Sequence, residues 1–171
     1  PSSAPLASHQ NYSVALVPSL SHDELVPRSR VTRRLAVINV QPGAGTLQAA
    51  LDAANAGDEL VLADGTYTSG LLVGGSVLDI GKTITIRAKN PRGAIIDGQN
   101  EHRCLSITSG TVVLEGLDIT GGSVSSADGG GMFIRGGTVT VSGTNIYQNT
   151  ATASGGGVYI HRLPISGPAL S

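Results

Sequence analysis

The chain has 171 residues, enough for one domain with a substantial hydrophobic core. Hydrophobic residues make up 40% of it, aromatic residues only 3% and charged residues 13%, while 24 residues are glycine. This composition suits a tightly turning β structure filled with small aliphatic side chains, and it excludes a helical bundle. The net charge of −1 provides no long-range field to attract nucleic acid or an anionic membrane, so no nucleic-acid partner is expected.

Cys104 is the only cysteine, which excludes an internal disulfide and a thiolate metal cluster. We interpret it as a small buried residue. No stretch approaches 18 consecutive apolar residues, so no membrane span is predicted. The chain begins at Pro1 without a methionine, from which we expect a processed chain or a fragment, in an organelle or exported.

Residues 1–34 differ from everything that follows. They are rich in serine and proline and lack a hydrophobic period, which predicts an extended or disordered amino-terminal arm. The arm ends in four arginines that are candidate contacts for a partner surface: Arg28, Arg30, Arg33 and Arg34. The alternative is a solvated tail, because Asp23 and Glu24 offset part of the positive charge. Residues 35–171 are predicted to form one domain.

This domain opens with a strand at 35–40, a glycine-rich turn and then a helix at about 46–56. The helix is predicted to have Thr46 as its N-cap and Gly57 as its stop. Its apolar face comprises Leu47, Ala50, Leu51 and Ala54. We expect this helix to cover one end of the domain. The stretch 58–67 is predicted to be a further strand that ends in a turn at Asp64 and Gly65.

From residue 78 onward the sequence repeats. One apolar triplet returns at steps of 27, 27 and 26 residues, as Leu78-Asp79-Ile80, Leu105-Ser106-Ile107, Met132-Phe133-Ile134 and Val158-Tyr159-Ile160. A second column of triplets lies at 84–86, 112–114 and 139–141, and a looser third at 95–97, 117–119 and 145–147. Most of these triplets place apolar side chains two residues apart, which is the period of a strand.

Three short strands in each repeat close one turn, or rung, of a solenoid, and rungs stack about 4.7–4.9 Å apart. The predicted fold is therefore all-β. It is a short parallel β-helix of about four rungs, with one continuous aliphatic core and an amino-terminal capping helix.

The same residues carry a resemblance to known families. Segments 57–67, 82–86 and 94–98 are similar to the opening rungs of right-handed parallel β-helix proteins of the pectin-lyase-like superfamily. The glycine runs 129–131 and 155–157 resemble the glycine-rich repeats of polymorphic-outer-membrane-type proteins. The resemblance covers about residues 36–162 and implies a right-handed, single-stranded β-helix. It does not define a function, because this fold hosts lyases, hydrolases, epimerases, adhesins and inert scaffolds.

Enzymes of this fold need clustered carboxylates, either to hold calcium or to hydrolyse a glycosidic bond. Asp97 and Asp118 are the candidates, because they fall in similar parts of successive rungs and would lie close if they project to one face. The alternative is turn chemistry, since Asp97 precedes Gly98. No positioned base or histidine accompanies the pair, which favours the alternative, and no metal or cofactor is predicted. Arg87 and Glu115 are interpreted as a surface ion pair.

Phe133 and Tyr159 are predicted binding residues, because both occupy the outward position of adjacent first-column strands and would stack outside the solenoid. Such rings hold a sugar ring or act as a protein hot spot, unless a loop packs over them. After Ile160 the repeat fades without a second capping helix. The carboxy-terminal edge is therefore predicted to be open, and an open strand edge invites pairing.

Together these features favour a non-catalytic structural or interaction module, a peripheral accessory subunit that docks onto a larger protein assembly. Its expected contacts are the open edge, the two rings and the arginine-bearing arm. One alternative is a carbohydrate-binding or polysaccharide-active protein of the lyase or epimerase type, with Asp97, Asp118 and Tyr159 as the residues to test. Another is a fragment of a surface adhesin.

Overall fold

A computed structural model describes residues 34–70 and 75–161. It contains one α-helix, α1 (Thr46–Ala53), among short strands. The strands are β1 (Val37–Val40), β2 (Gly43–Ala44), β3 (Glu59–Leu62), β4 (Gly65–Thr68), β5 (Ser76–Ile80), β6 (Ile84–Ala88), β7 (Ala94–Asp97), β8 (Arg103–Ile107), β9 (Thr111–Glu115), β10 (Asp118–Thr120), β11 (Ser123–Val124), β12 (Met132–Ile134), β13 (Thr138–Ser142), β14 (Asn145–Ile146), β15 (Thr150–Ala151) and β16 (Val158–Ile160).

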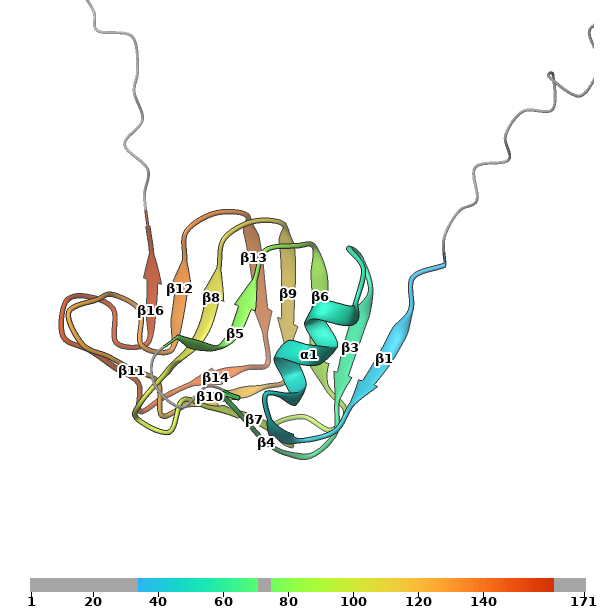
Figure 1. The fold of residues 1–171 in the computed structure, drawn as a ribbon, viewed down its shortest axis with the longest axis horizontal. Helices are drawn as coiled ribbons and strands as arrows, with labels where there is room; N and C mark the ends of the chain where they lie inside the picture. Colours follow the sequence, from blue (N-terminus) through green and yellow to red (C-terminus); the bar gives the residue numbers. More distant parts are fainter. Residues whose placement is uncertain (1–33, 71–74, 162–171) are drawn as a thin grey trace, which may run out of the picture. The chain divides into compact units, whose positions relative to one another are not determined.

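The strands form three long sheets, and the pairings between them are parallel. Sheet 1 has the order β1-β3-β6-β9-β13, sheet 2 the order β2-β4-β7-β10-β14, and sheet 3 the order β5-β8-β12-β16. A short pair, β11 and β15, lies beside them. Rungs follow one another from β1 at the right to β16 at the left in Figure 1. The chain is thus a parallel β-helix of about four turns, which confirms the predicted fold class.

The register confirms the first two predicted columns of triplets. In sheet 3, Leu78 pairs with Leu105, Leu105 with Met132, and Met132 with Val158. Sheet 1 aligns its inward positions in the same way. These inward side chains are buried in the inner rungs, and they form one core with the helix. Burying each contributes about 1.5–3 kcal/mol, so the stack as a whole stabilises the fold more than any one member.

The helix differs from its prediction at both ends. Its N-cap is Gly45, at a φ of 70°, because the turn from β2 into the helix needs a left-handed residue. The predicted N-cap, Thr46, is the first helical residue, and its hydroxyl donates to the carbonyls of Gln41 and Gly43. The helix ends at Ala53, before the predicted 56, because Ala54 is already extended.

The predicted role of α1 as a cap is confirmed. The helix lies beside β5, where sheet 3 would have its next strand (Figure 1), and its Leu47 and Leu51 are buried in the core. The Gln48 side-chain oxygen accepts the backbone N–H of Asp79 on the edge of β5, at 2.8 Å. The amino-terminal end of sheet 3 is therefore closed.

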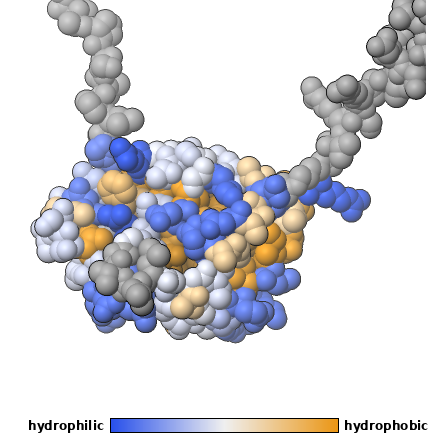
Figure 2. Space-filling model, viewed as in Figure 1, coloured by the Kyte–Doolittle hydropathy of each residue, from blue (hydrophilic) through white to orange (hydrophobic). Residues whose placement is uncertain are grey.

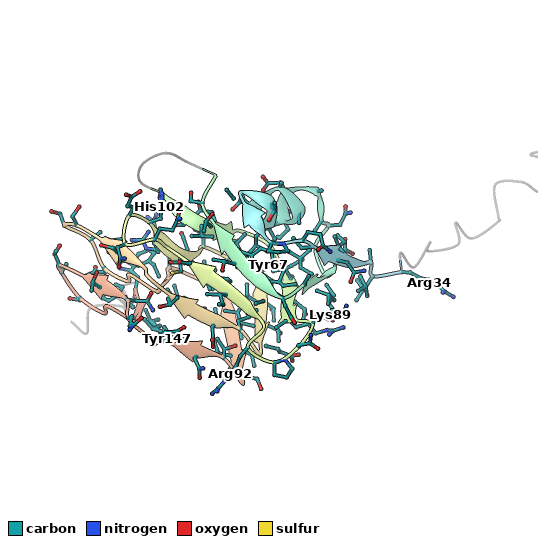
Figure 3. All side chains as sticks on the ribbon, turned by 90° about the horizontal axis from the view of Figure 1, so that it is seen from below. Arg34, Tyr67, Lys89, Arg92, His102 and Tyr147 are labelled. Carbon is teal, nitrogen blue, oxygen red and sulfur yellow. The ribbon has the colours of Figure 1, made fainter. Side chains whose placement is uncertain are left out.

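The stretch 58–67, predicted as one strand, forms two strands on different sheets, β3 and β4. Tyr67 of β4 points into the interior (Figure 3) and is fully buried. Its hydroxyl donates to the carbonyls of Val40 and Ala63, both at 2.8 Å. Burial, with a smaller effect from Asp64, raises the pKa of Tyr67 to about 12.

Candidate functional site

The candidate carboxylates Asp97 and Asp118 are not aligned on successive rungs. Asp97 pairs with Thr120 and Asp118 with Ile95, so the two acids are offset by two residues along the sheet. The Asp97 carboxylate accepts the backbone N–H of Gln99 at 2.7 Å, which is the turn chemistry of the alternative interpretation. The Asp118 carboxylate accepts from the side-chain amide of Asn145 at 2.9 Å. The expected alignment of the two acids is therefore wrong.

The predicted stack of Phe133 and Tyr159 is present. The ring centroids lie 5.7 Å apart and the ring planes differ by 2°. Both rings are half-buried. His161 approaches Phe133 at 6.4 Å between centroids, in a tilted arrangement. Two outward aromatic side chains from adjacent rungs thus form one surface feature.

Arg103, which the sequence analysis did not select, contacts this stack from the rung on the other side. Its guanidinium carbon lies 4.9 Å from the centre of the Phe133 ring, within the range of a cation–π contact. The same guanidinium donates to the carbonyls of Asp128 and Gly129, both at 2.9 Å. Burial lowers the pKa of Arg103, while Asp79 and Asp128 oppose that shift. Phe133 is therefore contacted from both neighbouring rungs.

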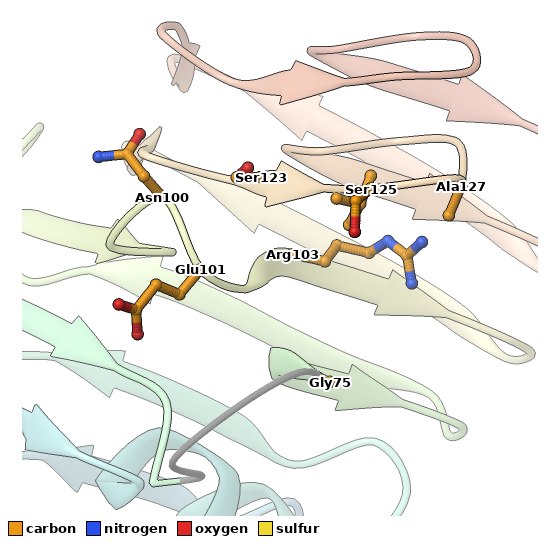
Figure 4. A pocket seen from close by; sticks show the side chains of 8 residues that line it. Gly75, Asn100, Glu101, Arg103, Ser123, Ser125 and Ala127 are labelled. Carbon is orange, nitrogen blue, oxygen red and sulfur yellow. The ribbon is translucent and has the colours of Figure 1, made fainter.

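Arg103 also lines a surface groove of about 510 Å³. Figure 4 shows its guanidinium directed toward the segment that carries Ser125 and Ala127, while the Glu101 side chain points away from it. The groove is lined by Gly75, Asn100, Glu101, Arg103, Ser123, Val124, Ser125 and Ala127. Its polar side chains are one cation, Arg103, one anion, Glu101, and the neutral groups of Asn100, Ser123 and Ser125.

The other predicted surface residues are the four arginines of the amino-terminal arm and the ion pair of Arg87. Arg28, Arg30 and Arg33 lie outside the described residues, and Arg34, the first described residue, is exposed. Arg87 forms its ion pair with Glu59 on the preceding rung, so the predicted pairing with Glu115 is wrong. Although Arg87 is opposite Glu115 in the register, its side chain extends to the other neighbour.

The predicted burial of Cys104 is confirmed, and a second polar side chain, Asn149, bonds turn backbone. Cys104 is buried, and this burial raises the pKa of its thiol to about 12. The Asn149 side chain bonds turn backbone: its oxygen accepts the N–H of Gly122 at 2.7 Å, and its nitrogen donates to the carbonyl of Ile119 at 3.0 Å. Both residues therefore have structural roles.

The last rung, defined here as residues 136–160, is open within the described part of the chain. Its strands β13, β14, β15 and β16 are each the outermost member of their sheet. Positions that are buried in inner rungs are exposed here, at 43% for Val141, 41% for Val158 and 63% for Ile160. Val139 and Ile146 are only partly buried. The predicted open carboxy-terminal edge is therefore present among residues 34–70 and 75–161.

The last rung also differs from its neighbours in charge. Residues 136–160 contain no Asp, Glu, Lys or Arg, whereas the preceding rung carries Glu115, Asp118, Asp128 and Arg135. Tyr147, 40% exposed, adds an aromatic side chain to the same edge. The opposite end exposes apolar atoms as well, over β1 at the right of Figure 2, where Val37 is 58% exposed. Only the carboxy-terminal end, however, combines exposed aliphatic side chains with a rung that lacks charge.

Comparison with known proteins identifies the fold. No family model matches the chain, and no curated protein matches it. Two solved structures match: the PL6 family alginate lyase AlyGC, and an arginine-to-alanine mutant of the same enzyme. They are 22% and 23% identical to this chain, each with a TM-score of 0.52. The fold is a right-handed parallel β-helix. Each match covers 73% of this chain and 18% of the enzyme, so the likeness spans less than a fifth of the enzyme's length.

Within residues 34–70 and 75–161, no group of three or more His, Cys, Asp or Glu side chains is placed to hold a metal ion. The same ranges contain no helix with the length and apolar character needed to span a membrane. The two surface features that the structure does bring together are the Arg103 groove with its aromatic stack, and the last rung.

Proposed function

We propose that this chain is a structural interaction module, and that the last rung is the surface through which it contacts another polypeptide. The observation that carries the proposal is the exposure of Val141, Val158 and Ile160 on outermost strands. The equivalent positions of the preceding rung are buried at Leu114 and Met132 and partly buried at Ile134. The three exposed residues lie on a rung without a charged residue.

An outermost strand presents backbone N–H and C=O groups in a row, and proteins protect such strands with charges, proline or a covering element. The last rung has no charges, and none of the described residues covers it. A partner strand that adds to this edge satisfies the backbone groups, and it buries the exposed aliphatic side chains. Each buried aliphatic side chain contributes about 1.5–3 kcal/mol before the cost of association.

Photo-crosslinking tests the proposal. A photoreactive amino acid is placed at Ile160, and in a second protein at Ala53, an exposed residue of α1 at the other end of the solenoid. We expect a polypeptide adduct at position 160, little adduct at position 53, and loss of the first adduct when Val141→Lys is added to the same chain. Equal adducts at both positions, or an adduct that persists with Val141→Lys, would show that the last rung is not the contact surface.

The Arg103 groove favours a second candidate function, the binding of an acidic polysaccharide. Arg103 can bind a carboxylate, and Asn100, Ser123 and Ser125 can bind hydroxyl groups. Uronate polymers such as alginate carry both groups, and the two matching structures are alginate lyases.

Calorimetry and an activity assay test this candidate. We expect alginate to bind the full chain, and Arg103→Ala to weaken binding at least tenfold. Arg135→Ala, which removes an exposed arginine outside the groove, is the matched control and leaves binding unchanged. Absorbance from unsaturated sugars with alginate and calcium, lost in Asp97→Ala, would instead favour a lyase that uses this acid. Absence of binding in calorimetry would eliminate the candidate.

A further inference from the structure

We infer that the polypeptide which covers the last rung is a second copy of this chain, in a closed dimer that joins the two carboxy-terminal ends. The inference rests on the proposed interaction function and adds the identity of the partner. It follows from three properties of the described residues: the lack of charge on the last rung, the equal need of two such ends for cover, and the helix that occupies the edge of sheet 3 at the other end.

The lack of charge allows a copy to approach. Two identical surfaces bring identical charges together, so a charged edge would repel its own copy. Residues 136–160 carry no formal charge, and their exposed side chains are aliphatic, aromatic, hydroxyl-bearing or, at Gln148, an amide. Repulsion between two copies is therefore small.

Both copies gain in the same way from such a contact. Each brings the same aliphatic side chains at the end of its core: Val139, Val141, Ile146, Val158 and Ile160. Placed end to end, the two cores become continuous, and the outermost strands of each copy can pair with strands of the other. A two-fold contact of this kind is self-complementary and complete at two copies.

The amino-terminal end is unsuited to accept the last rung of another copy. In sheet 3 the position next to β5 is occupied by α1, and the edge N–H of Asp79 is already bonded to Gln48. Lys82 holds the helix in this position, because its ammonium donates hydrogen bonds to the carbonyls of Leu51 and Ala54. A head-to-tail arrangement would leave β16 of one copy facing a helix, which offers it no strand. For sheet 3, a strand partner is therefore available when the two carboxy-terminal ends face each other, and not in the head-to-tail arrangement.

The two-fold arrangement makes a geometric prediction. A two-fold axis perpendicular to the solenoid reverses the direction in which the strands circulate, so the strands that face each other run antiparallel. One of the three sides of the last rung then faces the same side of the second copy. Of the other two sides, each faces the opposite one in the second copy. Residues on the self-facing side lie close to the same residues of the second copy.

Sedimentation equilibrium of the full chain tests the inference, with three variants. We expect a dimer. Val141→Lys and Ile160→Lys should each raise its dissociation constant at least tenfold, because they would bury unpaired charges. Val37→Lys, which changes an exposed strand residue at the other end, should leave the dimer unchanged. Circular dichroism of each variant checks that the fold is kept, as expected for side chains that are exposed in the single chain.

Single cysteines provide a second measurement that does not depend on weakened binding. Thr140→Cys, Tyr147→Cys and Tyr159→Cys each sample one side of the last rung, and the native Cys104 is buried. We expect at least one of them to form a disulfide with its own copy under mild oxidation. A head-to-tail contact would form none, because identical positions are then separated by the length of the solenoid.

The outcomes separate this inference from the proposed function. A chain that stays monomeric at all concentrations overturns the inference, and so does a dimer that Val37→Lys dissociates or that both rung variants leave intact. If the monomer still forms an adduct from position 160 to a different polypeptide, the proposed function stands and only the identity of the partner is wrong. If position 160 forms no adduct, both are wrong.

Discussion

The ammonium of Lys82 lies 2.9 Å from the carbonyl oxygen of Leu51, and so joins the turn before β6 to the carboxy-terminal end of α1. Carbonyls at that end of a helix have no partner inside the helix, and a positive charge there is favourable. The contact fixes the capping helix to a rung that is remote in sequence.

Replacing this lysine should therefore loosen the cap. We expect Lys82→Met to lower the free energy of unfolding by about 1–2 kcal/mol, because it removes two hydrogen bonds from a charged donor that is partly exposed. Urea unfolding measures the change. Lys89→Met, at an exposed lysine two residues beyond Arg87, is the matched control and should change the value by less than about 0.5 kcal/mol. Equal effects would contradict the capping role.

The inward column of sheet 3 should show a gradient of sensitivity. Leu105 is fully buried between Leu78 and Met132, and Leu105→Ala should cost about 2–5 kcal/mol because it leaves a cavity. Val158 ends the same column and is exposed, so Val158→Ala should cost less than about 1 kcal/mol in the monomer. Both values come from urea unfolding at protein concentrations below the dimer dissociation constant. Similar costs would mean that the last rung is covered within the chain.

Two glycines on adjacent rungs should respond differently to alanine. A Cβ on Gly130 would lie 2.1 Å from the carbonyl oxygen of Thr150, whereas on Gly157 its nearest neighbour is a methyl group of Ile146 at 3.8 Å. We expect Gly130→Ala to cost about 1–3 kcal/mol or more, since rigid backbone must move. Gly157→Ala should be nearly neutral. Thermal unfolding compares the two variants, and a tolerated alanine at 130 would contradict the close packing of the rungs.

Tyr67 should make the protein sensitive to alkali. Burial raises its pKa from 10.0 to about 12, so the fold favours the neutral phenol. The stability that this provides is fully present below pH 10, and it is lost as the pH rises toward 12. We expect the free energy of unfolding to fall over that window, and less steeply in Tyr67→Phe. Tyrosinate absorbance provides the check: an absorbance step near pH 10 that Tyr67→Phe removes would contradict the burial.

The period of the sequence was enough to predict the β-helix, because inward aliphatic residues at steps of 26 or 27 determine both the strand and its neighbour. Sheet 2 shows where this fails. Leu117 is buried at the corner before β10, and its apolar character made it look like the first residue of that strand. The resulting slip of one residue set Asp118 opposite Ile96 in the predicted triplets, whereas in the structure Asp118 lies opposite Ile95, two residues from Asp97.

The Arg103 contacts could not be predicted from the sequence. They depend on an aromatic ring one rung away and on two carbonyls at 128 and 129, and no local pattern relates these residues. The N-cap was missed for a different reason. Thr46 is a good capping residue by type, but the tight turn after β2 requires a positive φ, which only the preceding glycine adopts without strain.

The near-constant register between neighbouring rungs has a consequence for how such a protein can change in size. Each inner rung contacts chiefly the rung before and the rung after, and Val112 pairs with Val139 just as Ile84 pairs with Val112. Duplication of a whole repeat would thus insert a turn whose two faces match those it separates. The molecule could lengthen by one unit at a time while its helix-covered beginning and its uncharged ending stay as they are.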